Sequence, residues 1–245
     1  MDAPEVRRSV TADALAHDVA TALVTLLAET QAAGRVPCVA LTGGTIAGRV
    51  HQAVAASSGA SQVDWGRVDV WFGDERYVPA GDPERNARQA RESLLDRLPF
   101  DPARLHPMPA SDEGHPSLAD AAATYAAELR AGKADVFDVV MLGVGPDGHV
   151  ASLFPGFAQL DADDALVVPV IGSPKPPPER ISLTLPALNR AREVWFLVSG
   201  EGKAQAVARA LGPHTTPGVH ELPAVGVHGL DRTVWFLDED AASGL

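Results

Sequence analysis

The sequence predicts a doubly wound α/β protein, in which helices cover both faces of a mostly parallel sheet. Short apolar segments alternate with longer segments of helical periodicity along most of the 245 residues. That alternation is typical of βαβ units, whose crossover helices place successive strands parallel. Some of the apolar segments have no polar face, as expected for strands that are covered on both sides. No linker, repeat or shift in composition divides the chain, so we expect one domain over residues 1–245.

A long helix is the first element that the patterns predict. Thr11 can cap its N-terminus, apolar residues recur at helical spacing from Leu15 to Leu27, and Gly34 can end it. An apolar strand, VPCVAL, follows over residues 36–41. The same signals then predict, in order, helix 46–57, strand 68–72, helix 83–98, helix 117–132 and strand 137–142.

The second half places further strands around a proline-rich loop. Residues 149–154 can form only a short helix, because a proline and a glycine follow. Between expected strands 165–171 and 181–185, the loop GSPKPPPER carries Lys175 and Arg180, which stiff prolines could hold over a site. The last elements are strand 193–198, a helix over 199–213 that ends at Gly212 and Pro213, strand 233–237 and a polar tail.

Charge and composition narrow the range of partners. The formal net charge of −12 disfavours nucleic acid and anionic membranes, and a small anionic ligand would need a local group of positive side chains. The one cysteine, Cys38, lies in an apolar strand and fits a reducing compartment. Residues 1–10 lack the apolar stretch of a secretory signal, and no segment approaches the ~18 apolar residues of a membrane span. We therefore expect a soluble cytoplasmic protein.

Two loops that directly follow strands have the chemistry of anion binding. In parallel sheets, ligands bind beyond the carboxyl ends of the strands. Thr42-Gly43-Gly44-Thr45 follows strand 36–41, and its glycines allow a turn whose N–H groups and hydroxyls could hold a phosphate. The alternative is a simple turn with a threonine cap. Arg76 follows strand 68–72 and could bind a phosphate or carboxylate with two hydrogen bonds, unless this charged segment is only a solvated loop.

The stretch GVGPDGHVASLFPG contains the spacing G-x-G-x-x-G, which is also that of a dinucleotide-binding turn. A proline lies inside the motif, only a short helix can follow, and no acid stands at the end of the next strand, so the match is read as accidental. What remains is Asp147 and His149 on one tight turn, a pair typical of general base catalysis. Lys203, in the first turn of a helix, would be favourable beside a bound anion. The other histidines show no metal-binding spacing, so no metal is expected.

Five segments together resemble the 6-phosphogluconolactonases: LTGGT, WFGDERYVP with Asn86 downstream, LGVGPDGHVASLFPG, SPKPPPERISLT and VSGEGKA. The resemblance implies a cytosolic enzyme of the oxidative pentose phosphate pathway that hydrolyses 6-phospho-D-glucono-1,5-lactone without a required cofactor. It also implies the three-layer α/β/α fold shared with glucosamine-6-phosphate deaminases and ribose-5-phosphate isomerases. We expect a monomer or a weak homo-oligomer.

The expected reaction assigns a role to each candidate residue. His149 would deprotonate the attacking water, Asp147 would help to orient or polarise the site, and backbone N–H groups of residues 143–148 would hold the oxyanion. The substrate contacts would be Gly43, Gly44, Thr45, Asp74, Arg76, Asn86, Arg180 and Lys203. Arg180 and Lys203 follow mainly from the resemblance. The resemblance also implies a small residue before Asn86, where this chain has Arg85.

Three other functions remain open. One is an isomerase or deaminase that acts on an amino sugar phosphate. The pattern that resembles such deaminases is a DGH motif followed closely by a second carboxylate, whereas here no acid occurs between His149 and Asp161. A sugar-phosphate sensor would need the phosphate-binding residues but not His149. The third is a nicotinamide enzyme, which only the G-x-G-x-x-G spacing supports.

Overall fold

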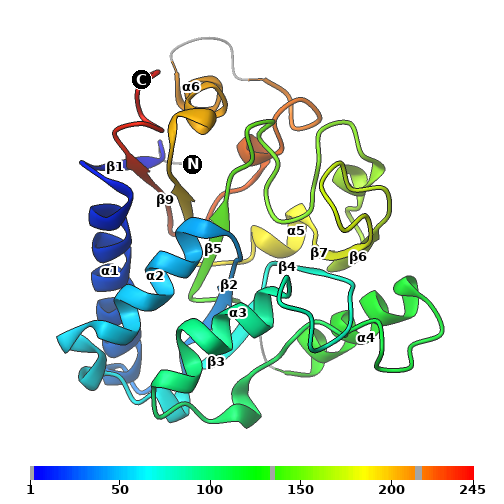
Figure 1. Cartoon of the computed structure of the whole chain (residues 1–245), viewed down its shortest axis with the longest axis horizontal. Coiled ribbons are helices and arrows are strands. Elements are labelled where there is room, and N and C mark those ends of the chain that lie inside the picture. Colours follow the sequence, from blue (N-terminus) through cyan, green and yellow to red (C-terminus); the bar gives the residue numbers. More distant parts are fainter. Residues whose placement is uncertain (1–2, 133–135, 213–216) are drawn as a thin grey trace.

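A six-stranded parallel sheet forms the centre of the computed structural model, which describes residues 3–132, 136–212 and 217–245. Its strands lie in the order β1 (Glu5–Ser9), β9 (Arg232–Asp238), β8 (Glu193–Val198), β5 (Val139–Gly143), β2 (Cys38–Leu41) and β3 (Asp69–Phe72). Every pair of neighbours is parallel. The predicted mostly parallel sheet is confirmed (Figure 1).

Three helices pack on one face of this sheet: α1 (Ala12–Ala32), α2 (Thr45–Ala56) and α3 (Asn86–Ser93). The hydroxyl of Thr11 accepts a hydrogen bond from the N–H of Ala14 at 3.1 Å, so the predicted cap of α1 is present. Leu15 and Leu23 of α1 are buried in the same apolar cluster as Phe72 and Phe236 of the sheet. Figure 1 shows α1, α2 and α3 following one another across the molecule.

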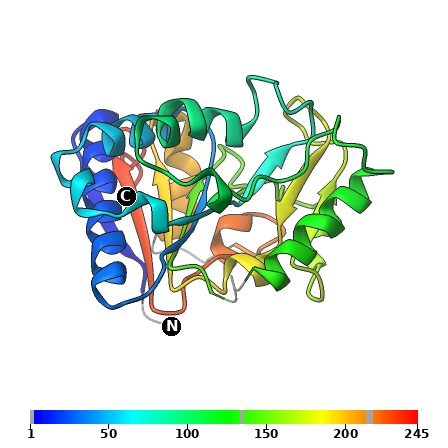
Figure 2. The ribbon, with the colours of Figure 1, turned by 90° about the horizontal axis from the view of Figure 1, so that it is seen from below.

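The opposite face is covered by α4 (Leu118–Ala131), α5 (Leu185–Leu188), α6 (Ala204–Leu211) and a second, smaller sheet. That sheet has the order β4 (Asp74–Arg76), β7 (Arg180–Leu183) and β6 (Val167–Val170), and both of its pairs are antiparallel. Figure 2 shows it beside α4, at the end of the molecule away from α1. Helices on both faces confirm the predicted α/β/α class, and the antiparallel sheet is an addition that the sequence did not indicate.

Several element predictions were wrong. Residues 149–154 form no helix, because Ala151 has a left-handed φ of 49° and Val150 makes isolated bridges to Val144 and Leu153. Residues 74–76, expected as loop, are β4, and β1 was not predicted. The helix expected over 83–98 is α3 followed by a 3₁₀ turn at Leu95–Arg97. Pro213, expected to end the helix after β8, lies outside the described residues.

No helix within the described ranges is both long and apolar enough to cross a bilayer.

Candidate active site

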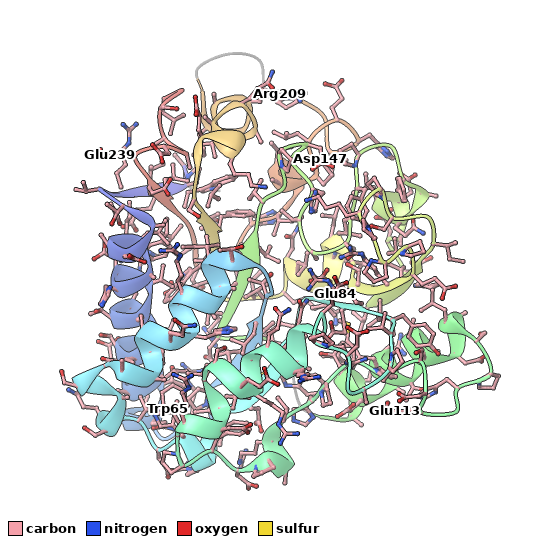
Figure 3. All side chains as sticks on the ribbon, viewed as in Figure 1. Trp65, Glu84, Glu113, Asp147, Arg209 and Glu239 are labelled. Carbon is pink, nitrogen blue, oxygen red and sulfur yellow. The ribbon has the colours of Figure 1, made fainter. Side chains whose placement is uncertain are left out.

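A cavity of about 410 Å³ opens at the carboxyl ends of β2, β5 and β8. The chain leaves β2 for β3 on one side, whereas β5 lies on the other side, so the cavity is at the switch point where ligands bind in such sheets. The predicted residues that line it are Gly43, Gly44, Thr45, Asp74, Arg76, Asn86, His149, Arg180 and Lys203. Asp147 is not among the lining residues but bonds to one of them. Figure 3 shows Asp147 at the same end of the molecule as Arg209 of α6.

The glycine-rich loop lies where a ligand could meet the start of α2. Gly44, at the N-cap position, has a φ of 98°, which a side chain would strain, and no side-chain cap bonds to the helix there. A Cβ atom at Gly43 would overlap the carboxamide of Asn86, so only glycine lets these segments meet. The simple threonine-capped turn is therefore not what forms, because Thr45 is already inside the helix.

Four positive side chains converge on the cavity in a chain whose net charge is −12. They are Arg76, Lys175, Arg180 and Lys203. The register of β4 and β7 places Arg76 directly opposite Arg180. The arginine side chains find little neutralisation within the protein: the buried Nε of Arg76 has no hydrogen-bond partner among the described residues, and Arg180 donates to the carbonyls of Lys175, Pro176 and Pro177.

Burial lowers the pKa of three of these cations. It is the main cause that lowers the pKa of Arg180, with Asp74 opposing and Arg76 adding to the effect. Burial also lowers the pKa of Lys175 and that of Lys203, whose next cause is the charge of Lys175. An anion with more than one negative charge would relieve this repulsion.

Asp147 and His149 form a hydrogen-bonded pair on the turn after β5. Nδ1 of His149 lies 2.5 Å from Oδ1 of Asp147. Partial burial raises the pKa of Asp147, but the hydrogen bond and charge of His149 outweigh it and bring that pKa to about 2. Because an ionised carboxylate only accepts hydrogen bonds, Nδ1 carries the proton of this bond, and in the neutral imidazole Nε2 is the nitrogen with a free lone pair.

The turn itself fixes the imidazole. A Cβ atom at Gly145 would overlap both the ring of His149 and the carboxylate of Asp147. Gly148 has a φ of 81° and packs against Leu222, whose segment donates a further bond, from the N–H of Ala224 to the Gly148 carbonyl. The glycines of the motif thus allow the backbone to pack closely against the side chain of His149. A dinucleotide-binding turn would use them to begin a helix.

Two backbone N–H groups of residues 143–148 donate hydrogen bonds within the turn. Gly145 donates to the carbonyl of His149, Gly148 donates to that of Gly145, and His149 donates to the Asp147 carboxylate at 3.3 Å. Gly145 and Gly148 therefore have no free N–H for an oxyanion, and for the other residues of 143–148 the expectation stays a prediction. The cations that line the cavity are further donors.

Asp74 and Asn86, which also line the cavity, are bonded to each other. Nδ2 of Asn86 donates to the carbonyl of Asp74 at 2.8 Å and to its carboxylate at 3.2 Å. The other carboxylate oxygen of Asp74 accepts from Ser152 Oγ at 2.6 Å. Ser152 was missed because it lies in an apolar segment far along the chain, and nothing local indicates its partner.

Within the described part of the chain, no three His, Cys, Asp or Glu side chains are grouped as metal ligands would be.

Comparison with known proteins gives a family match over residues 10–235, to the model described as glucosamine-6-phosphate isomerases/6-phosphogluconolactonase. The chain belongs to this family. It is 46% identical over 252 aligned residues to the 6-phosphogluconolactonase of Streptomyces coelicolor, and the alignment covers 100% of this chain and 95% of that protein. The resemblance seen in the five segments is thereby confirmed.

Solved structures of family members superpose on the whole fold. The 6-phosphogluconolactonase of Thermotoga maritima has a TM-score of 0.82 at 28% identity, covering 96% of this chain and 99% of that one. A monomeric glucosamine-6-phosphate deaminase has the same TM-score, 0.82, at 18% identity, covering 98% and 100%. The second likeness shows that the two kinds of enzyme share the fold, so the site must decide between them.

Proposed function

We propose that this protein hydrolyses 6-phospho-D-glucono-1,5-lactone to 6-phospho-D-gluconate, with His149 as the general base. The observation that carries the proposal is a hydrogen-bonded His149–Asp147 pair at a cavity lined by four cations. The cations suit the phosphate and the developing oxyanion, and the imidazole suits a water molecule. High identity to a lactonase over the whole chain supports the same substrate.

The reaction follows from these groups. Nε2 of His149 takes a proton from water as the water oxygen attacks the lactone carbonyl, and the carbonyl oxygen becomes an oxyanion. Cations lining the cavity stabilise that charge. When the tetrahedral intermediate collapses, the bond to the ring oxygen breaks, and the protonated His149 returns its proton to that oxygen. Asp147 holds the imidazole in the required tautomer and stabilises its charged form.

A deaminase acting on an amino sugar phosphate is the second candidate, and the cavity disfavours it. Among the residues described, Asp74 is the only carboxylate in the lining, and it is engaged by Ser152 and Asn86. Asp161, the first acid after His149, lies outside the lining and pairs with His220 at 2.8 Å. Within the described part of the chain, no carboxylate besides Asp74 lines the cavity where it could assist ring opening.

The test is a lactone-opening assay, corrected for spontaneous hydrolysis. His149→Ala should lower kcat/KM by about 10² to 10⁴, the usual contribution of a general base. His220→Ala is the matched control, because it removes a second histidine that is paired with an aspartate outside the cavity, and it should keep the parent rate. A His149→Ala variant as fast as the parent would remove the assigned base. Ammonia release from glucosamine-6-phosphate without lactone opening would favour the deaminase.

The proposal includes the setting of the enzyme. We expect one domain over residues 1–245, acting in the cytoplasm as a monomer or a weak homo-oligomer, with no need for a cofactor or nucleic acid. Light scattering of the purified protein across a dilution series measures the oligomeric state. Full activity after exhaustive dialysis against a chelator would agree with the expectation that no cofactor is required.

A further inference from the structure

We propose that Glu75 is a positioning residue that holds Arg76 and Asn86 at the cavity, and that buried Arg85 keeps its carboxylate charged. The inference rests on the proposed lactonase function, and it adds two residues that do not line the cavity. Glu75 is fully buried and Arg85 is 3% exposed, so neither can act on the substrate directly.

The carboxylate of Glu75 joins two segments that are separated by a loop. Its Oε1 accepts hydrogen bonds from the N–H of Arg76 at 2.9 Å and from the N–H of Asn86 at 2.7 Å. Its Oε2 accepts from the N–H of Ala87 at 2.9 Å. Arg76 is the last residue of β4, and Asn86 is the first of α3. One carboxylate oxygen therefore fixes the backbone of both residues whose side chains face the cavity.

The same carboxylate replaces the usual cap of α3. Arg85 occupies the N-cap position, and its side chain makes no cap hydrogen bond. Glu75, ten positions earlier in the chain, satisfies two N–H groups of the first turn instead. Loss of this cap would free the start of α3 to move. The carboxamide of Asn86, which bonds to Arg76 Nη1 and to Asp74, would then move with it.

Arg85, which does not line the cavity, supplies the opposite charge. Its Nε lies 3.8 Å from Oε2 of Glu75, and its other nitrogens donate to the carbonyls of Met108, Pro109 and Val78. All four partners of the carboxylate among the described residues are thus donors, and a proton on Glu75 would find no acceptor among them. Burial raises the pKa of Glu75, while Arg85 and the three backbone N–H groups oppose that rise.

Glu75→Gln tests the inference, because it keeps the shape of the side chain but places its amide N–H₂ group against the N–H donors that the carboxylate accepts from. We expect kcat/KM for the lactone to fall by between about tenfold and a hundredfold, as for other small displacements of a binding group. Calorimetric binding of 6-phosphogluconate should weaken in the same variant. Glu75→Asp keeps the charge and should lose less. Circular dichroism in the near ultraviolet gives the folded fraction, to which every rate is normalised.

A double-mutant cycle separates positioning from plain stability. In an Asn86→Ala background, Glu75→Gln should cost at least threefold less than in the parent, because one of the groups it positions is gone. Glu75 does not contact Lys203. In a Lys203→Met background, Glu75→Gln should therefore lower kcat/KM by the same factor as in the parent. Equal losses in all three backgrounds, or parent kinetics with only a lower melting temperature, would overturn the inference. If Glu75→Gln does not fold, the same cycle with Glu75→Asp decides.

The parent enzyme distinguishes the two proposals. A parent without lactone opening above the spontaneous rate refutes the proposed function, and the cycle is then read from 6-phosphogluconate binding. An active parent whose cycle is additive refutes only the role of Glu75.

Discussion

His51 should make the protein sensitive to acid, by an amount that its surroundings allow us to calculate. It lies in α2, 2% exposed, with Nδ1 3.1 Å from Ser93 Oγ of α3. Ser93 donates its own proton to the carbonyl of Gln89 at 2.5 Å, so it accepts from Nδ1. The remaining nitrogen, Nε2, is buried without a partner among the described residues. Burial lowers the pKa of His51 from 6.5 to about 4.

The sign of the effect follows from the two pKa values. The unfolded chain binds this proton near pH 6.5 and the folded protein only near pH 4, so protonation favours the unfolded state. The part of the unfolding free energy that depends on neutral His51 is therefore fully present above pH 6.5 and is lost as the pH falls toward 4. Linkage gives a loss of about 2 kcal/mol in unfolding free energy between pH 7 and pH 5 from this one group.

Guanidinium unfolding of the parent and of His51→Gln, followed by tryptophan fluorescence at constant ionic strength, measures this loss. The variant is expected to be less stable at pH 7, and the difference should shrink by about 2 kcal/mol at pH 5, since glutamine does not titrate. His220→Gln, at an exposed position, controls for the loss of an imidazole as such. Parallel stability curves for the parent and His51→Gln between pH 7 and pH 5 would refute the reasoning.

Four further substitutions test the site and the core. Gly43→Ala should lower kcat/KM at least tenfold in the lactone assay, because the added methyl group would displace Asn86. Gly48→Ala is its control, because a methyl group there contacts nothing within 4 Å. This control should keep the parent activity and raise the free energy of unfolding by about 0.5–1 kcal/mol in a denaturant titration. Asp147→Asn should lower kcat by about 10² or more in the same assay, because the charge that orients His149 is lost. Tyr125→Phe should cost about 1–3 kcal/mol in the same titration, since the N–H of Phe72 would lose its buried acceptor at 3.0 Å.

The sequence predicted the elements that have a strong local signal. The apolar strands of the main sheet and the amphipathic α1 follow from periodicity, and the loops after those strands do line the cavity. β1 has no such signal, because it is an edge strand whose charged residues face solvent or pair across it, as Glu5 does with Arg232 at 2.8 Å.

The remaining features depend on contacts between distant residues. Asp74 and Glu75 were expected in a loop because charges are usually solvated, yet both are buried, since Ser152, Asn86 and Arg85 provide donors from elsewhere in the chain. The left-handed residue that prevents a helix after His149 is an alanine, which carries no turn signal. Asn86 was expected only from the resemblance, since nothing local shows which way its amide turns.

The register that sets Arg76 opposite Arg180 has a practical consequence for anyone who handles this protein. Like charges paired across two strands disfavour the folded state, and an oxyanion between them would turn that repulsion into attraction. Melting temperature should then rise with sulfate or phosphate in the solution. The same ions would compete with the sugar, so a Michaelis constant measured in phosphate buffer would be too high. Buffers of bulky, weakly coordinating anions suit this protein best.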